Sequence, residues 1–212
     1  MAVESWSLSQ SGQFCLTLSA GKTAENTLAA YGADASEARY LTSEEFFRTY
    51  KPTATSAALR VGSFRKWSFC IEFENCIGFM PGIQRKLSQD TEAFLLSRAG
   101  NAYTVLDYTV DGEVAESFEP GNGVTRVPSS HDFAGKAERL AESSDSITAT
   151  LEILAEYTGL HVTTALLNGP LLSVVIPNPD RKTLMRNDSI RPERVDPSQT
   201  PRGLGRHLGS IP

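Results

Sequence analysis

The sequence predicts a single α+β domain with a central, mainly antiparallel sheet of five to seven strands flanked by short helices. Three observations support this class. Strand-like runs with period-two alternation gather between residues 57 and 120, capped helix-like runs lie on either side of them, and the connections are short. We expect this domain to cover residues 1–176 and a flexible tail to cover residues 177–212.

The N-terminal elements are a strand and two short helices. Residues 13–19 alternate between apolar and other side chains, which predicts a strand. Thr23 suits the N-cap of a following helix, and Gly32 suits the position just after its end. Ser43 is the expected cap of a second helix over residues 44–50, because acidic residues occupy the first turn, where the helix dipole favours them.

The central strands carry the clearest pattern. They are expected over residues 58–64, 66–74, 92–98, 103–110 and 113–118. In the second of these, one face holds large apolar side chains: Trp67, Phe69, Ile71 and Phe73. The other face holds Lys66, Ser68, Cys70, Glu72 and Glu74. Asp111-Gly112 is a strong hairpin turn sequence, and short connections between consecutive strands favour antiparallel pairing.

The C-terminal part of the domain returns to helices. Residues 132–143 have apolar side chains at helical spacing, and a second helix capped by Asp145 or Ser146 is expected to end at Gly159. After a single turn opened by Thr163, the apolar run 171–176 predicts a buried last strand.

Charge and composition restrict the environment and the partners. The net charge is −5. Residues 1–176 contain 13 Lys/Arg and 21 Asp/Glu, a net of −8, and residues 177–212 contain 7 Lys/Arg and 4 Asp/Glu, a net of +3. An acidic body disfavours nucleic-acid binding. The sequence has no membrane-length apolar run and no basic leader, so we expect a cytoplasmic protein whose three cysteines are reduced thiols.

No complete catalytic or metal-binding motif is present. A nucleophile elbow, a phosphate loop and a clustered Cys/His set are all missing from the sequence, so we expect no catalytic residues, no cofactor and no metal. Glu72 and Glu74 share a strand face, and Asp107, Glu113 or Glu116 could join them to bind a divalent cation. The solvated outer face of an acidic domain is the favoured interpretation of these carboxylates.

The candidate binding residues surround an apolar, glycine-rich connection. Residues 75–83 follow the Glu72/Glu74 strand and form either a contact patch, if exposed, or a plug at one end of the sheet, if buried. The predicted binding residues are Glu72, Glu74, Ile77, Phe79 and Met80.

Several short motifs together resemble a known family. They are Trp6, Phe14–Leu18, Leu28, Gly32-Ala33, Arg60–Gly62, Trp67, Glu72, Gly78, Leu87-Ser88, Asp111-Gly112, Ser117–Pro120, Glu156–Gly159 and Gly169–Leu171. The set is similar to an uncharacterised family of small actinobacterial proteins, a domain of unknown function, over roughly residues 5–176. This resemblance implies a cytoplasmic single domain and no particular activity.

The leading functional hypothesis is a non-enzymatic protein-binding module of immunity- or antitoxin-like character. An acidic surface favours a basic protein partner, because complementary charge accelerates encounter. Two alternatives remain open: a metal-dependent hydrolase that uses the strand carboxylates, and an adaptor that acts through residues 177–212.

Overall fold

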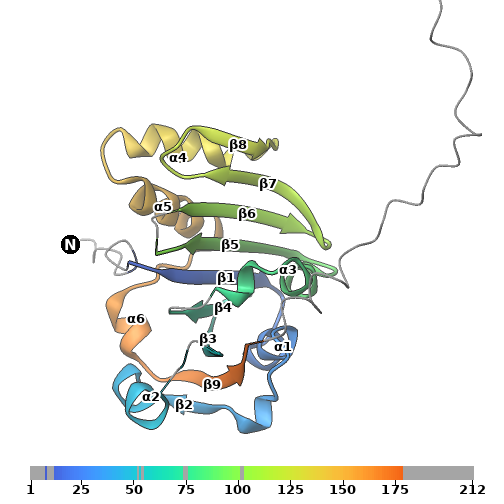
Figure 1. Ribbon diagram of the computed structural model, residues 1–212. Helices are drawn as coiled ribbons and strands as arrows, with labels where there is room; N and C mark the ends of the chain where they lie inside the picture. The colour runs from blue at the N-terminus through green and yellow to red at the C-terminus, as the bar shows by residue number, and fades with distance from the viewer. Residues whose placement is uncertain are drawn as a thin grey trace, which may run out of the picture.

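The computed structural model describes residues 8, 12–51, 53, 55–73, 76–100 and 103–178. Over this part of the chain, nine strands form one sheet in the order β2-β9-β3-β4-β1-β5-β6-β7-β8 (Figure 1). Every strand pairing is antiparallel. The α+β class is therefore confirmed.

The elements follow one another along the chain with short connections. The strands are β1 (Phe14–Ala20), β2 (Arg39–Leu41), β3 (Ser56–Phe64), β4 (Trp67–Glu72), β5 (Glu92–Arg98), β6 (Thr104–Val110), β7 (Glu113–Glu119), β8 (Val124–Val127) and β9 (Leu171–Pro177). The α-helices are α1 (Ala24–Ala30), α2 (Ser43–Thr49), α3 (Pro81–Ser88), α4 (Phe133–Ala141), α5 (Ser146–Thr158) and α6 (Thr164–Asn168). Two 3₁₀ turns, η2 (Ala35–Glu37) and η3 (Ile77–Phe79), complete the set.

The predicted number of strands, five to seven, was too low. The two unpredicted strands are β2, with three residues, and β8, with four, and they form the two ends of the sheet. Each pairs with a neighbour on one side only, β9 and β7 respectively. Such short edge strands show too few alternations for periodicity to reveal them.

Side-chain caps define most of the helix N-termini. Thr23 accepts a hydrogen bond from Asn26 N at 3.2 Å, as predicted, and Asp145 caps α5 while Gly159 ends it with φ of 74°. The second helix differs from the prediction, because Thr42 rather than Ser43 is its cap. Thr42 and Glu45 form a reciprocal capping box, which uses the acid of the first turn as a second acceptor.

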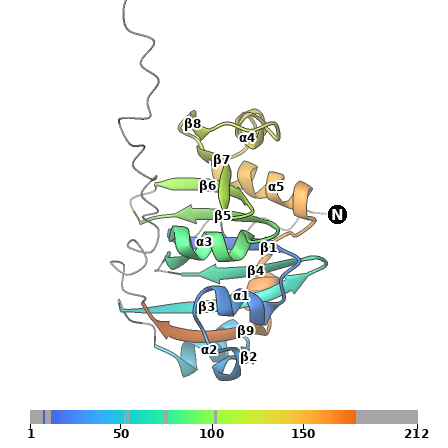
Figure 2. The ribbon, with the colours of Figure 1, turned by 90° about the vertical axis from the view of Figure 1, so that its right-hand side faces the viewer.

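Helices cover both faces of the sheet, and each covered face has its own apolar core (Figure 2). On one face, Phe14, Trp67 and Phe94 pack with side chains of α4, α5 and α6. On the other face, Leu59 and Cys70 belong to a second core with residues of α1 and α3. The sheet is therefore the middle layer of three.

The second core changes the position of one candidate residue. Trp67, Phe69 and Ile71 are buried, as the alternation of β4 predicts. The opposite face of β4 was expected to be solvated, and that expectation is wrong, since Cys70 and Glu72 are both 0% exposed. Alternation distinguishes two faces of a strand but not whether one of them is wet, because Ser, Thr, Cys and Glu can be buried when they are hydrogen-bonded.

No helix of the described part of the chain is long and apolar enough to cross a membrane. The predicted tail begins at Pro177, the last residue of β9, and its residues 179–212 lie outside the described residues.

Candidate functional site

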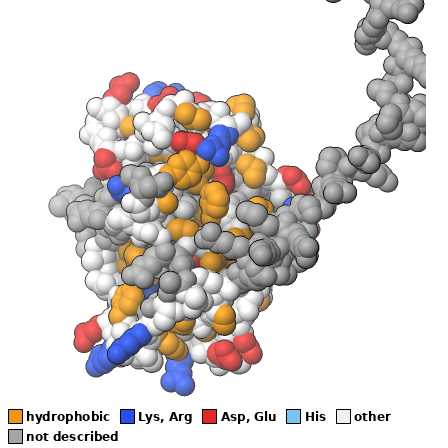
Figure 3. All heavy atoms as spheres, in the orientation of Figure 1, with side chains coloured by type: hydrophobic (Ala, Val, Ile, Leu, Met, Phe, Trp, Pro, Cys, Tyr) orange, Lys and Arg blue, Asp and Glu red, His pale blue; other side chains and the backbone are white. Residues whose placement is uncertain are grey.

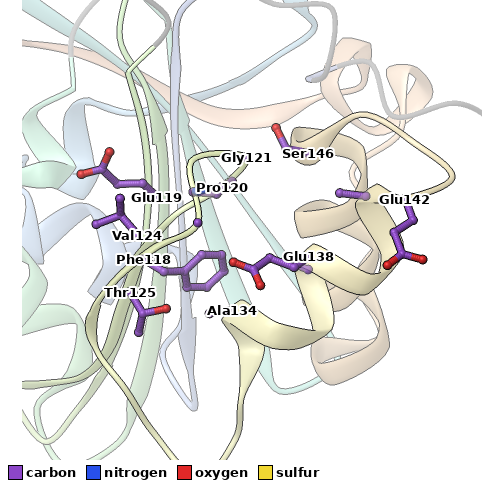
Figure 4. Close-up of a pocket in the computed structure, with 13 residues that line it drawn as sticks. Phe118, Glu119, Pro120, Gly121, Val124, Thr125, Ala134, Glu138, Glu142 and Ser146 are labelled. Carbon is purple, nitrogen blue, oxygen red and sulfur yellow. The ribbon is translucent and has the colours of Figure 1, made fainter.

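A groove lies between the β7–β8 hairpin and helices α4 and α5. It has a volume of about 350 Å³ and is lined by thirteen residues from these elements (Figure 4). Phe118, Pro120 and Val124 come from the hairpin, while Ala134 and Ala137 come from α4. The groove is thus largely apolar and lies at the end of the sheet formed by β8.

The turn between β7 and β8 sets one end of the groove. Gly121 has φ of 83° and Gly123 has φ of 63°, a backbone conformation that L side chains rarely adopt. A Cβ atom at Gly121 would lie 2.8 Å from Ser146 Oγ, at the start of α5. Glycine at this position therefore allows the turn to pack directly against the helix.

Small side chains on α4 leave the space open. Asp132 begins the helix by accepting a hydrogen bond from Gly135 N at 3.2 Å. The helix then presents Ala134, Ala137 and Ala141 to the groove, at helical spacing. Alanine side chains extend only one carbon from the backbone, so a hollow remains between α4 and β8.

Carboxylates stand beside these apolar walls. Glu119 is ion-paired with Arg126, whose Nη2 lies 2.5 Å from Glu119 Oε1. Hydrogen bonds, chiefly the one from Arg126, lower the pKa of Glu119. Glu138 extends from α4 toward Phe118, and Glu142 marks the far end of the helix (Figure 4). No other described residue forms an ion pair with Glu138 or Glu142. Within the described part of the chain, the groove therefore offers uncompensated negative charge next to apolar surface.

The strands beside the groove also expose aliphatic side chains. Val124 and Val127 of β8 are 45% and 36% exposed, and Val110 and Val114 at the β6–β7 hairpin are 41% and 45% exposed. Apolar side chains over the upper strands lie next to charged ones (Figure 3). The outer edge of β8 has no neighbouring strand in the described sheet. Exposed aliphatic residues at an unpaired strand edge are typical of surfaces that receive another chain.

The residues predicted to bind a partner lie elsewhere, around η3, and they do not form one surface. Glu72 is fully buried and Ile77 is 4% exposed, while Phe79 is 43% exposed and Met80 is partly exposed. Glu74 lies outside the described residues. The segment 75–83 was expected to be either an exposed contact patch or a buried plug. Its described residues include both kinds, since Ile77 is buried and Phe79 lies at the surface.

The strand carboxylates that could have formed a metal site are dispersed. Asp107 shares the face of Glu72 but lies three strands away from it, which separates the strands by about 14 Å. Glu116 lies on the opposite face, where it accepts hydrogen bonds from Ala134 N at 2.8 Å and from Ser129 Oγ. No group of three or more His, Cys, Asp or Glu residues in the described ranges could hold a metal ion. The hydrolase hypothesis gains no support from this arrangement.

His131 belongs to an aromatic cluster rather than to a catalytic group. Its ring stacks on Phe133 at 5.3 Å and meets Tyr108 and Tyr157 edge-on. Glu92 accepts hydrogen bonds from Tyr108 Oη at 3.0 Å and Tyr157 Oη at 2.7 Å. These hydrogen bonds satisfy the Glu92 carboxylate and connect β5 with β6 and α5.

The groove itself was not predicted from the sequence. Its one sequence feature is the spacing of Ala134, Ala137 and Ala141, which also fits an ordinary buried helix face. Only the position of β8, itself unpredicted, turns this alanine face into a groove wall.

The fold defines a small, single-sheet α+β protein with an open groove at one end of the sheet. A family of unknown function, DUF6461, matches residues 3–174, so the chain belongs to that family. This confirms the resemblance to an uncharacterised family, with nearly the same boundaries. No curated protein and no solved structure matches the chain.

Proposed function

We propose that this protein is a non-enzymatic binding module that receives a basic segment of a protein partner in the groove between β8 and α4. The observation that carries the proposal is the combination of an apolar hollow with the carboxylates Glu138 and Glu142, neither of which forms an ion pair with a residue that the structure describes. We therefore assign the proposed binding surface to this groove rather than to Glu72 and the η3 connection.

A lysine or arginine side chain has the matching chemistry. Its aliphatic stem can pack against Phe118, Val124 and the alanines, while its charged head remains near Glu138 at the mouth of the groove. A volume of about 350 Å³ lies at the lower end of the range for ligand pockets, enough for one or two large side chains. The exposed edge of β8 can pair with the extended backbone that carries those side chains.

The charge of the molecule supports a basic partner. Residues 1–176 carry a net charge of −8, which attracts cationic partners over distances of about a Debye length and raises the rate of encounter. A small acidic protein that captures a basic partner is similar in character to immunity and antitoxin proteins. That comparison is an analogy of charge and size.

Binding of designed peptides tests the proposal. We expect a fluorescent peptide of alternating lysine and leucine to bind, whereas lysine/serine and glutamate/leucine peptides bind more weakly, because the groove requires both charge and apolar contact. The double substitution Glu138→Gln/Glu142→Gln is expected to weaken binding about 5-fold, since two exposed ion pairs contribute about 0.5 kcal/mol each. Fluorescence anisotropy at low salt measures the affinities.

A matched variant separates the groove from the overall charge. Glu152 and Glu156 lie exposed on α5 and outside the groove, so Glu152→Gln/Glu156→Gln removes the same charge elsewhere. Ala141→Leu fills the groove without a change of charge and should also weaken binding. Equal losses in the two double variants, or an unaffected Ala141→Leu variant, would assign the binding to net charge and contradict the groove.

A further inference from the structure

Two cysteines and a glutamate that are far apart in the sequence meet on the buried face beneath η3. Cys15 on β1 lies opposite Glu72 of β4 and opposite Ser97 of β5 in the strand registers. Cys76 directly precedes η3, and its thiol donates a hydrogen bond to the carbonyl oxygen of Phe14, the residue before Cys15, at 3.6 Å. The structure thus brings Cys76 close to Cys15, although the whole segment from β1 to β4 lies between them in the sequence.

Glu72 fixes the backbone that carries Cys76. Its two carboxyl oxygens accept hydrogen bonds from Ile77 N and Gly78 N, both at 2.9 Å. A Cβ atom at Gly78 would lie 2.6 Å from Tyr31 Oη and 2.8 Å from Glu72 Oε1, so only glycine allows this approach. Because these amides belong to the two residues after Cys76, the carboxyl group fixes the backbone next to Cys76.

The surroundings of Cys76 favour its thiolate. Hydrogen bonds from Cys15, Ser97 and Gln13 lower the pKa of the Cys76 thiol to about 7, and partial burial opposes this effect. Cys76 is partly exposed, whereas Cys15 is 0% exposed. Burial raises the pKa of the Cys15 thiol, which therefore keeps its proton. One thiol is nucleophilic and accessible, and the other lies protected behind it.

We propose that Cys76 and Cys15 form a reactive dithiol, in which Cys76 is oxidised by a hydroperoxide and Cys15 then closes an intramolecular disulfide. This site is independent of the groove between β8 and α4. Glu72 is a positioning residue in this proposal, because it acts through the backbone of η3.

The two steps balance as follows. The Cys76 thiolate attacks one oxygen of the hydroperoxide, the O–O bond breaks, and with one proton the products are Cys76 sulfenic acid and an alcohol, or water from hydrogen peroxide. Cys15 sulfur then attacks the sulfenic sulfur, the S–O bond breaks, and the Cys15 proton leaves with the hydroxide as water. The two thiols lose two electrons in total, and the peroxide gains them.

Cys70 provides an internal control. It lies two residues before Glu72 on β4 and is 0% exposed, and burial raises the pKa of its thiol. In the strand register it faces Thr17 rather than Cys15. It therefore shares the fold and the burial of the cluster but lies two register positions away from Cys15.

The experiment treats the reduced full chain with one equivalent of hydrogen peroxide under native conditions. We expect the intact mass to fall by two hydrogens and the peptide map to show Cys15 linked to Cys76, with Cys70 still free. The Cys70→Ala variant should give the same linkage. In the Cys15→Ala variant the reaction should stop at Cys76 sulfenic acid, which dimedone traps. The Cys76→Ser variant should lose the rapid reaction with hydrogen peroxide.

Two readouts do not depend on the buried Cys15 substitution being tolerated. In the wild-type chain, the rate of Cys76 alkylation by iodoacetamide should rise with a midpoint near pH 7, because only the thiolate reacts. The disulfide map of wild type and Cys70→Ala tests the pair directly. A linkage that includes Cys70, sulfenic acid that persists on wild-type Cys76, or thiols unchanged by peroxide would each overturn the proposal.

Discussion

Replacing Glu72 by glutamine is expected to change the pH dependence of folding stability more than any other single carboxylate substitution. Burial raises the pKa of Glu72 to about 8 from its ordinary 4.5, although two backbone amides oppose the shift. A carboxyl group whose folded pKa is raised contributes most below its unfolded pKa, and that contribution is lost as pH rises through about 8. The wild type should therefore lose about 4 kcal/mol from this group between about pH 5 and pH 9.

The Glu72→Gln variant should lack this pH-dependent contribution to the free energy of unfolding. Near pH 5 we expect it to be less stable than the wild type by about 1–3 kcal/mol, since one of the two amides of η3 loses its acceptor. Near pH 9 the difference should vanish or reverse, because glutamine carries no buried charge. Urea unfolding at each pH measures the difference between the two proteins.

Comparing the wild type with Glu72→Gln separates the effect of Glu72 titration from that of Cys76. Cys76 titrates in the opposite sense, because its lowered pKa adds stability as pH rises above about 7. Glu113→Gln on the exposed β6–β7 turn is the matched control and should follow the wild-type curve. A difference between wild type and Glu72→Gln that stays constant with pH would contradict the assigned burial of this carboxyl group.

Replacing Arg60 by leucine is expected to give the largest loss of stability among the basic residues. Arg60 is 1% exposed and lies on β3. Its guanidinium donates to the backbone carbonyls of Leu167, Leu41 and Gly169, the last two at 3.0 Å. Leu167 lies in α6, Gly169 directly follows that helix, and Leu41 lies in β2. One side chain on β3 therefore connects elements that the sequence separates.

Loss of Arg60 leaves those carbonyls without a donor. We expect Arg60→Leu to lower the free energy of unfolding by about 3–5 kcal/mol, and Arg60→Lys to recover only part of it, because an ammonium group cannot match the planar fork. Arg48→Leu on α2 is the control. Arg48 forms an exposed i,i+4 ion pair with Glu44, so a change within about 0.5 kcal/mol is expected. Equal unfolding midpoints for Arg60→Leu and the wild type would contradict this role.

Local chemistry was predictable wherever a short stretch decides the structure. Thr23, Asp145 and Gly159 cap or end helices, as their positions in the sequence indicate. Asp111-Gly112 forms the predicted hairpin turn between β6 and β7, and both residues have positive φ. These outcomes depend on side-chain hydrogen bonds and backbone freedom within a few residues.

The sites could not be predicted in the same way, because they depend on contacts between distant segments. Glu72 was expected at the surface, and its burial follows from η3 and α3, which cover that face of the sheet. The three cysteines were expected to be reduced thiols, and the approach of Cys76 to the Phe14–Cys15 backbone depends on the pairing of β1 with β4. The groove requires α4 to lie beside β8, an edge strand too short to recognise.

The sequence by itself determined the class of fold, most of the strands and helices and the acidic character of residues 1–176. It could do so because periodicity, capping and charge are properties of neighbouring residues. Tertiary structure alone decided that both sheet faces are covered, which carboxylate is buried, which thiols meet and where a groove remains open. Those outcomes depend on which layer packs on which face, and alternation along a strand carries no information about the layer above it.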